Sequence, residues 1–197
     1  MFFPAHSRYH HRLLTIEQAV QVVESFDDPS DAASIKSRDL TLLLLRNTPS
    51  PFSRSQFVPG HVTATGLVLA TDGERLLLVH HAKLNRWLLP GGHIEEEDDE
   101  VWKTASREVT EETGVVLSPG PGVLAGLDVH GIPPHKGKPY HLHHDVVFYF
   151  RAESYDCRLS HESRAVAWAH PDRFKFYELS SNIRLAYERV RAIHLGL

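Results

Sequence analysis

Three glutamates are concentrated in one short stretch of the sequence, Arg-Glu-Val-Thr-Glu-Glu, as Glu108, Glu111 and Glu112. On a helix that turns about 100° per residue, Glu108 and Glu112 lie one turn apart beside the apolar stripe. Glu111 lies just beyond the edge of that stripe. Two carboxylates about 4 Å apart repel by about 4 kcal/mol at an effective dielectric constant near 20. The arrangement therefore requires protons, an arginine or a metal ion to neutralise it.

A hard divalent cation fits this set of side chains best. Carboxylate oxygens suit Mg²⁺ or Mn²⁺, and Mg²⁺ is usually held by few carboxylates together with substrate phosphates. Two plainer explanations compete, because charge-rich helices are commonly solvated and Arg107 could simply pair with Glu111. The glycine pair Gly91-Gly92 lies just upstream. Glycine lets the backbone approach a ligand closely or adopt a positive φ, which a plain surface helix does not need.

The elements that must position these residues form two unequal parts. Helical spacing of apolar residues predicts helices over 15–25 and 33–46, and a stretch rich in proline and serine follows at 47–60. We therefore expect a helical N-terminal extension and linker over 1–56 and a second domain over 57–197. Within that domain the helix that carries the glutamates is expected over 99–113, and a closing helix over 181–193. The predicted strands are 61–70, 74–81, 123–129, 142–152 and 165–169, the first two joined as a hairpin through Thr71-Asp72-Gly73.

The glutamate segment carries a family resemblance. It resembles the signature of the Nudix hydrolases, MutT-like proteins in which glycine, five residues, glutamate and seven residues precede Arg-Glu-aliphatic-x-Glu-Glu-x-Gly-aliphatic. The second half of this signature is matched in full by residues 107–115, and Trp-Leu-Leu-Pro-Gly-Gly ahead of it resembles the usual approach. The order of the predicted elements agrees from about residue 61 to residue 194. The helical first quarter lies outside the common core of the family.

The resemblance implies an α/β fold, an α/β/α sandwich with a mixed β-sheet, and a function. That function is hydrolysis of a nucleoside diphosphate linked to another moiety, with Mg²⁺ or Mn²⁺ as cofactor. Glu108 and Glu112 are carried over as metal ligands, Glu111 as a third candidate, and Arg107 as the residue that orients them. The catalytic base is either Glu108 or an acidic residue on a later loop, for which Glu162 is the candidate. A non-catalytic module that binds a nucleotide or a protein partner is the alternative.

The sequence departs from the signature at one place. There is one residue too many between Gly92 and Arg107, so the first acidic position is either Asp98 or Asp99. In the family this residue mainly supports the loop and the helix. We favour Asp99, which has the right spacing to Arg107.

A histidine-rich strand follows, Tyr-His-Leu-His-His-Asp-Val-Val. Strand alternation places His141, His143 and Asp145 on one face. This face could bind substrate as a wall of the cleft, could contribute to a zinc site, or could be solvated. In the preceding loop Lys136 and Lys138 could contact phosphate.

Composition limits the remaining functions. The net charge of −4 gives no overall positive field for duplex nucleic acid, and no apolar run reaches membrane-spanning length. A single cysteine, Cys157, cannot form an intrachain disulfide, and no targeting segment is evident, so we expect a cytoplasmic protein. The expected partner is a nucleotide-derived small molecule. The N-terminal helices could cover the cleft, build a homodimer interface or cap the sheet.

Overall fold

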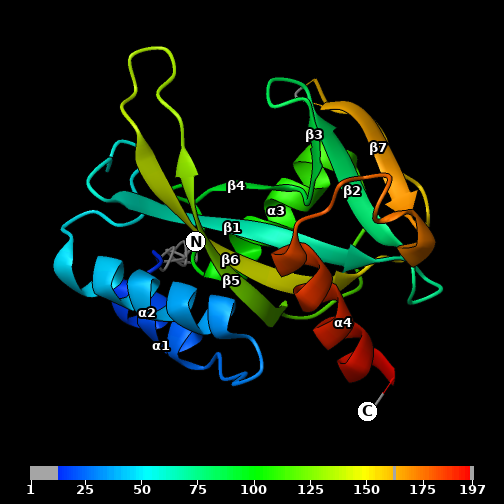
Figure 1. The fold of residues 1–197 in the computed structure, drawn as a ribbon, viewed down its shortest axis with the longest axis horizontal. Helices are drawn as coiled ribbons and strands as arrows, with labels where there is room; N and C mark the ends of the chain where they lie inside the picture. The colour runs from blue at the N-terminus through cyan, green and yellow to red at the C-terminus, as the bar shows by residue number, and fades with distance from the viewer. Residues whose placement is uncertain (1–12, 162, 196–197) are drawn as a thin grey trace, which may run out of the picture.

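A curled mixed sheet forms the centre of the molecule in the computed structural model, which describes residues 13–161 and 163–195 (Figure 1). β1 pairs in parallel with β6 along its whole length and antiparallel with β2 and β4. The strand order is β3-β2-β1-β6-β5, and β7 pairs with β2. The strands are β1 (Gly60–Leu69), β2 (Leu76–His81), β3 (Arg86–Leu88), β4 (Gly91–His93), β5 (Val123–Ile132), β6 (His141–Arg151) and β7 (Ser163–Ala169). The predicted mixed α/β fold is confirmed, and the three-residue strands β3 and β4 were not predicted.

Two helices precede the sheet, α1 (Ile16–Glu24) and α2 (Ala32–Asn47). The Thr15 hydroxyl accepts a hydrogen bond from the Gln18 amide, and the Gln18 side chain accepts one from the Thr15 amide, so α1 begins with a capping box. Asp31 caps α2 by accepting from the Ser34 amide at 3.0 Å. Both predicted helices are confirmed.

The glutamate helix is α3 (Val101–Thr113), and its apolar stripe packs on the sheet. Val101, Ala105 and Val109 are buried, and the absence of a side chain at Gly66 of β1 makes room for Val109. The helix ends at Gly114, whose φ of 64° is the left-handed conformation that favours glycine. The closing helix is α4 (Ser181–Leu195), which follows the short 3₁₀ helix η1 (Pro171–Arg173).

Two apolar clusters fill the two faces of the sheet. One cluster joins α1, α2 and α3 to the sheet face that carries Val62, Ala64 and Phe148. The other packs α4, through Tyr187 and Val190, on the opposite face. The N-terminal helices therefore cap one face of the sheet and share its core, as Figure 1 shows for α1 and α2 beside β5 and β6. The division of the chain at residue 57 stays a prediction.

A partly buried arginine links the C-terminal helix to the N-terminal pair. Arg189 of α4 donates to Asp28 and to Asp31 at 2.8 Å each, and also to the carbonyl of Ala125 on β5. Burial alone would raise the pKa of Asp31, but the hydrogen bonds from the Ser34 amide and from Arg189 hold that pKa below its ordinary value. The link therefore depends on Asp31 being ionised.

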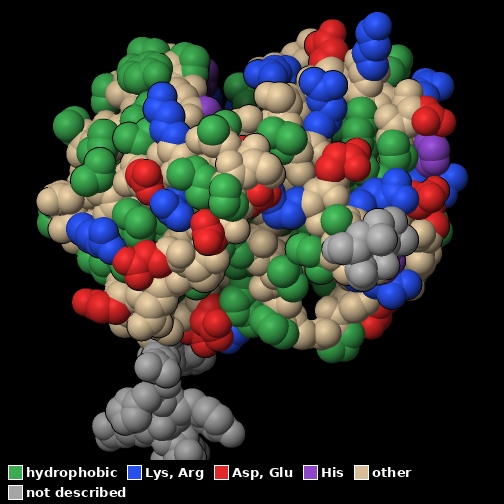
Figure 2. All heavy atoms as spheres, turned by 60° about the horizontal axis from the view of Figure 1, so that its bottom comes forward, with side chains coloured by type: hydrophobic (Ala, Val, Ile, Leu, Met, Phe, Trp, Pro, Cys, Tyr) green, Lys and Arg blue, Asp and Glu red, His purple; other side chains and the backbone are tan. Residues whose placement is uncertain are grey.

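The outer surface of α1, α2 and α4 carries charges of both signs. Figure 2 shows acidic and basic side chains interspersed on this side of the molecule, with no broad patch of one sign. Among the helices described, none has the length and apolarity that crossing a membrane requires.

Candidate functional site

One cleft brings the sequence-predicted residues together. It has a volume of about 930 Å³ and lies between α3, β4 and the face of β1, β5 and β6 that carries odd-numbered residues on β1 and β6. The predicted residues that line it are Gly91, Gly92, Arg107, Glu108, Glu111, Glu112, His143 and Asp145. Segments far apart in the sequence therefore meet around one site.

The carboxylate of Glu108 is more enclosed than that of Glu111. Its side chain is 14% exposed, whereas that of Glu111 is 59% exposed. A Cβ atom on Gly92 would lie 2.5 Å from the carboxyl carbon of Glu108, so glycine is required for the carboxylate to lie over this strand. Neither Gly91 nor Gly92 has a positive φ. Of the two reasons considered for the glycine pair, close approach is the one that the backbone shows.

Arg107 holds the acidic groups in place. It donates to Asp98 through Nε and Nη2, to Glu108 through Nη1 at 2.9 Å, and to the carbonyl of His93 at 2.9 Å. A longer contact of 3.3 Å reaches Glu111. The hydrogen bonds to Asp98, and the charge of Glu108, raise the pKa of Arg107 further above its ordinary value. The guanidinium thus donates hydrogen bonds to three carboxylates, and it stays charged at every accessible pH.

The acidic residue that supports the loop and the helix is Asp98, and the preference for Asp99 is wrong. Asp98 is 7% exposed and accepts hydrogen bonds from Arg107, from the Thr104 hydroxyl at 2.8 Å and from the Glu95 amide at 3.0 Å. Burial would raise the pKa of Asp98, but these hydrogen bonds lower it below the ordinary value. Asp99 instead pairs with Lys103 near the surface. The extra residue of the sequence therefore lies between Asp98 and the start of α3.

The opposite wall of the cleft comes from β1 and β6. The Thr63 and Thr65 hydroxyls donate to the same oxygen of Asp145, at 3.0 Å and 2.8 Å. Burial raises the pKa of Asp145 in spite of these two bonds. His143 lies on the same face, as strand alternation predicted. His141, in contrast, is buried against Phe57 and does not line the cleft.

Several cleft residues were missed by the sequence analysis. Asp128 of β5 lies opposite Asp145 in the strand register and accepts from Asn182 of α4. Its hydrogen bond with His130 lowers the pKa of Asp128 and raises that of His130. The cationic side chains on the cleft wall are Arg54, Lys83, Arg86, Arg107 and Lys138. Of the two loop lysines considered, Lys138 lines the cleft.

Two further histidines, His61 of β1 and His93 of β4, were also missed. Both follow a glycine in the sequence, Gly-His at residues 60–61 and Gly-Gly-His at 91–93. The only signal in the sequence was that each histidine directly follows a glycine, a residue that allows close approach of the backbone. In the structure their rings lie 5.1 Å apart and both are close to the ring of His143.

The outside candidate for the catalytic base, Glu162, lies outside the described residues. The two residues before it, Ser160 and His161, line the cleft. The loop that precedes β7 therefore reaches the site.

Comparisons with known proteins agree with this geometry. A family model described as NUDIX domain matches residues 59–190, more than half of the chain. A search of curated proteins found no match. Among solved structures, the NUDIX domain of Shewanella oneidensis NrtR, complexed with ADP ribose, is 23% identical with a TM-score of 0.51; the match covers 77% of this chain and 97% of that one.

Two more solved structures share the fold. A hydrolase of the NUDIX family from Clostridium perfringens is 20% identical with a TM-score of 0.50, over 68% of this chain and 97% of that one. A NUDIX hydrolase from Nitrosomonas europaea is 22% identical with a TM-score of 0.50, over 68% and 88%. With the signature residues gathered in one cleft and the family model covering the sheet and its helices, the chain belongs to the Nudix family.

Proposed function

We propose that this protein is a Mg²⁺- or Mn²⁺-dependent pyrophosphohydrolase. Its substrate is a nucleoside diphosphate linked to another moiety: a nucleoside triphosphate, a nucleoside diphosphate sugar or a compound of the ADP-ribose type. The observation that carries the proposal is the convergence of Glu108, Glu111 and Glu112 on one cleft beside Gly92. A surface helix without chemistry has no reason to gather three carboxylates there.

The residues present fit a hard divalent cation. Glu108, Glu111 and Glu112 supply only oxygen donors, which Mg²⁺ and Mn²⁺ prefer. Glu108 is largely enclosed, and it lies against a glycine whose missing side chain leaves its carboxylate room. When bound there, such a cation neutralises phosphate oxygens and lowers the pKa of a water molecule.

The protein's own side chains prepare the site. Arg107 fixes Glu108 and is itself fixed by Asp98, so the carboxylate is oriented before substrate arrives. The cationic side chains Arg54, Lys83, Arg86 and Lys138 line the cleft and suit the negative charge of a diphosphate. Removal of the proton from the attacking water falls to Glu108 or to Glu162.

The nature of the second moiety is the finer part of the proposal. The NrtR NUDIX domain, which shares this fold, was solved with ADP ribose. A cleft of about 930 Å³ has room for a dinucleotide-sized compound. We therefore place compounds of the ADP-ribose type first in the panel to be tested.

The deciding experiment is hydrolysis of a panel of nucleoside diphosphate compounds with Mg²⁺, with Mn²⁺ and with EDTA. We expect cleavage that depends on the metal and is lost in Glu112→Gln while far-UV circular dichroism is unchanged. The matched control is Glu97→Gln, because Glu97 is an exposed glutamate of the same segment that does not line the cleft. Binding of a nucleotide without cleavage would support the silent module instead, and a fully active Glu112→Gln would end its assignment as a ligand.

A further inference from the structure

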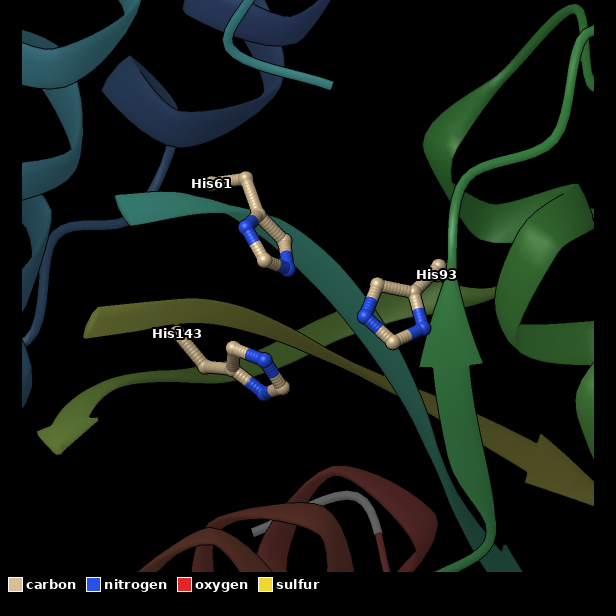
Figure 3. Close-up of side chains that lie close together, drawn as sticks. All are labelled: His61, His93 and His143. Carbon is tan, nitrogen blue, oxygen red and sulfur yellow. The ribbon is translucent and has the colours of Figure 1, made fainter. Parts of the chain in front are cut away.

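Three histidines from three strands converge at one end of the cleft. His61 comes from β1, His93 from β4 and His143 from β6, and one ring nitrogen of each lies within 4.8 Å of the others. Figure 3 shows the three rings turned toward a common space. The strand register explains the meeting, because His61 lies directly opposite His143 in the parallel pair and His93 lies opposite Thr63, two residues along β1.

One ring nitrogen of His61 is buried and could bind a ligand. Its side chain is fully buried, and its Nε2 atom has no hydrogen-bond partner among the described residues. Its Nδ1 atom lies 3.1 Å from the carbonyl of Gln56, and a carbonyl can only accept, so Nδ1 bears the proton. Nε2 therefore presents a lone pair at a position shielded from bulk solvent. A carbonyl behind the distal nitrogen is the usual outer-shell arrangement of a metal-binding histidine.

The surroundings lower the pKa of each of the three imidazoles. Burial, and then the neighbouring histidines and Arg54, lower the pKa of His93 to about 4. Burial and the same group of rings lower the pKa of His143 to about 2, and burial also lowers the pKa of His61.

We propose that His61, His93 and His143 bind a zinc ion at a site distinct from the carboxylate site. Imidazole nitrogen suits zinc and other borderline transition metals and not Mg²⁺. In a tetrahedral site with Zn–N distances of about 2.0–2.1 Å the nitrogens are about 3.4 Å apart, so these rings need to draw together by no more than about 1.5 Å. Rotations of the three side chains can supply that movement.

The fourth position of this zinc opens on the cleft. His93 and His143 line the cleft, whereas His61 is buried behind them. Three histidines with an open position are the arrangement of a site that binds an exchangeable ligand, here a water molecule or a phosphate oxygen. The site is adjacent to the carboxylates, because the carbonyl of His93 accepts from Arg107.

Packing of rings alone does not account for the group. His141 also packs on His61, with ring centroids 5.2 Å apart, but its Nδ1 contacts the carbonyl of Pro139 and its nitrogens are not part of the converging set. On the other face of β6, His144 contacts the Thr41 hydroxyl at 3.2 Å, away from the cleft. His144 is therefore a matched control: it is a buried histidine on the same strand whose Nε2 atom also lacks a hydrogen-bond partner among the described residues, but it is not part of the converging set.

The test is the zinc content of the full chain, purified without a histidine tag, equilibrated with excess zinc and gel-filtered. We expect one zinc per chain by mass spectrometry, and Co²⁺ in its place should give the visible absorption of a tetrahedral site. His93→Gln and His143→Gln should lower zinc affinity by at least about 100-fold in competition with a chromophoric chelator. Far-UV circular dichroism of each variant shows whether the fold is kept, and having two variants keeps the test decisive if one of them fails to fold.

Three controls separate this site from other sources of zinc binding. His144→Gln and Glu112→Gln should retain one zinc, and so should His10→Gln/His11→Gln, which removes the paired histidines near the N-terminus. The proposal is overturned if the wild-type chain holds no zinc, if His93→Gln and His143→Gln keep it, or if Glu112→Gln loses it. Zinc binding does not depend on hydrolysis, so the proposed function and this site can fail separately.

Discussion

Arg107 binds Asp98 through two nitrogens, with Nε 3.2 Å from one carboxylate oxygen and Nη2 2.8 Å from the other. This two-pronged contact fixes the plane of the guanidinium, which leaves Nη1 directed at Glu108. The position of a carboxylate in the cleft is therefore set by an aspartate that does not line the cleft.

Asp98→Asn should test that dependence. The amide cannot replace the charge that offsets Arg107, so we expect the free energy of unfolding to fall by about 2–3 kcal/mol. We also expect kcat of the proposed hydrolysis to fall by roughly tenfold or more, because Glu108 loses its fixed position. Chemical denaturation and steady-state kinetics measure the two effects. Asp99→Asn is the control, and equal losses in both variants would contradict the assignment of the brace.

Gly91→Ala and Gly92→Ala should separate stability from activity. A Cβ at Gly91 would lie 2.8 Å from the Ala64 carbonyl, which is backbone, so we expect a loss of about 1–3 kcal/mol in stability. The three atoms nearest to a Cβ at Gly92 all belong to the Glu108 carboxylate, which can swing away. Gly92→Ala should therefore fold with little loss of stability and lose roughly 100-fold in kcat/KM. Full activity of Gly92→Ala would show that the proposed hydrolysis does not depend on this position of the Glu108 carboxylate.

Arg189→Met should destabilise the protein in a way that depends on pH. At pH 7 we expect a loss of about 3 kcal/mol, because Asp31 is left buried and charged. In the wild type the lowered pKa of Asp31 stabilises the fold above the unfolded pKa near 3.8, and this contribution disappears as the pH falls through the folded pKa. The difference between variant and wild type should therefore shrink as the pH falls from 6 to 3. Urea denaturation at several pH values measures it.

The double variant Arg189→Met/Asp31→Asn is the control for that experiment. Removing the charge that Arg189 offsets should recover part of the stability at pH 7. A loss that is the same at every pH would mean that Arg189 acts through packing alone.

Glu162→Gln should slow the chemical step and leave the affinity for Mg²⁺ little changed. The residues before it in the sequence, Ser160 and His161, line the cleft. If Glu162 takes the proton from water, single-turnover rates should fall by about 10²–10⁴-fold. Unchanged single-turnover rates would leave Glu108 as the base.

The sequence predicted the elements whose signals are local. The capping box at Thr15 and Gln18 and the apolar stripe of α3 each lie within one turn or one face of a helix, so they can be read without tertiary structure. Strands β3 and β4 are three residues long and have no measurable periodicity. They exist because β1 and β2 offer them partners.

The candidate site was predictable where its residues lie close together in one segment of the sequence, as on α3 and along β6. Glu108, Glu111 and Glu112 are close in sequence, and the structure brings them to one cleft. The choice between Asp98 and Asp99 depended on where Arg107 reaches in space, and spacing alone gave the wrong one. The three histidines lie at positions 61, 93 and 143, and their meeting depends on a strand register that no local pattern reveals.

The first apolar cluster has a practical consequence, since α1 and α2 cover the same sheet face as α3. A fragment trimmed to the family match at residue 59 would uncover Val62, Leu127 and Val146, all almost fully buried in the intact chain. Such a fragment would expose a contiguous apolar surface, which promotes aggregation. We therefore expect a fragment shortened to the family match to precipitate, and negative assays on that fragment would not bear on the activity of the full chain.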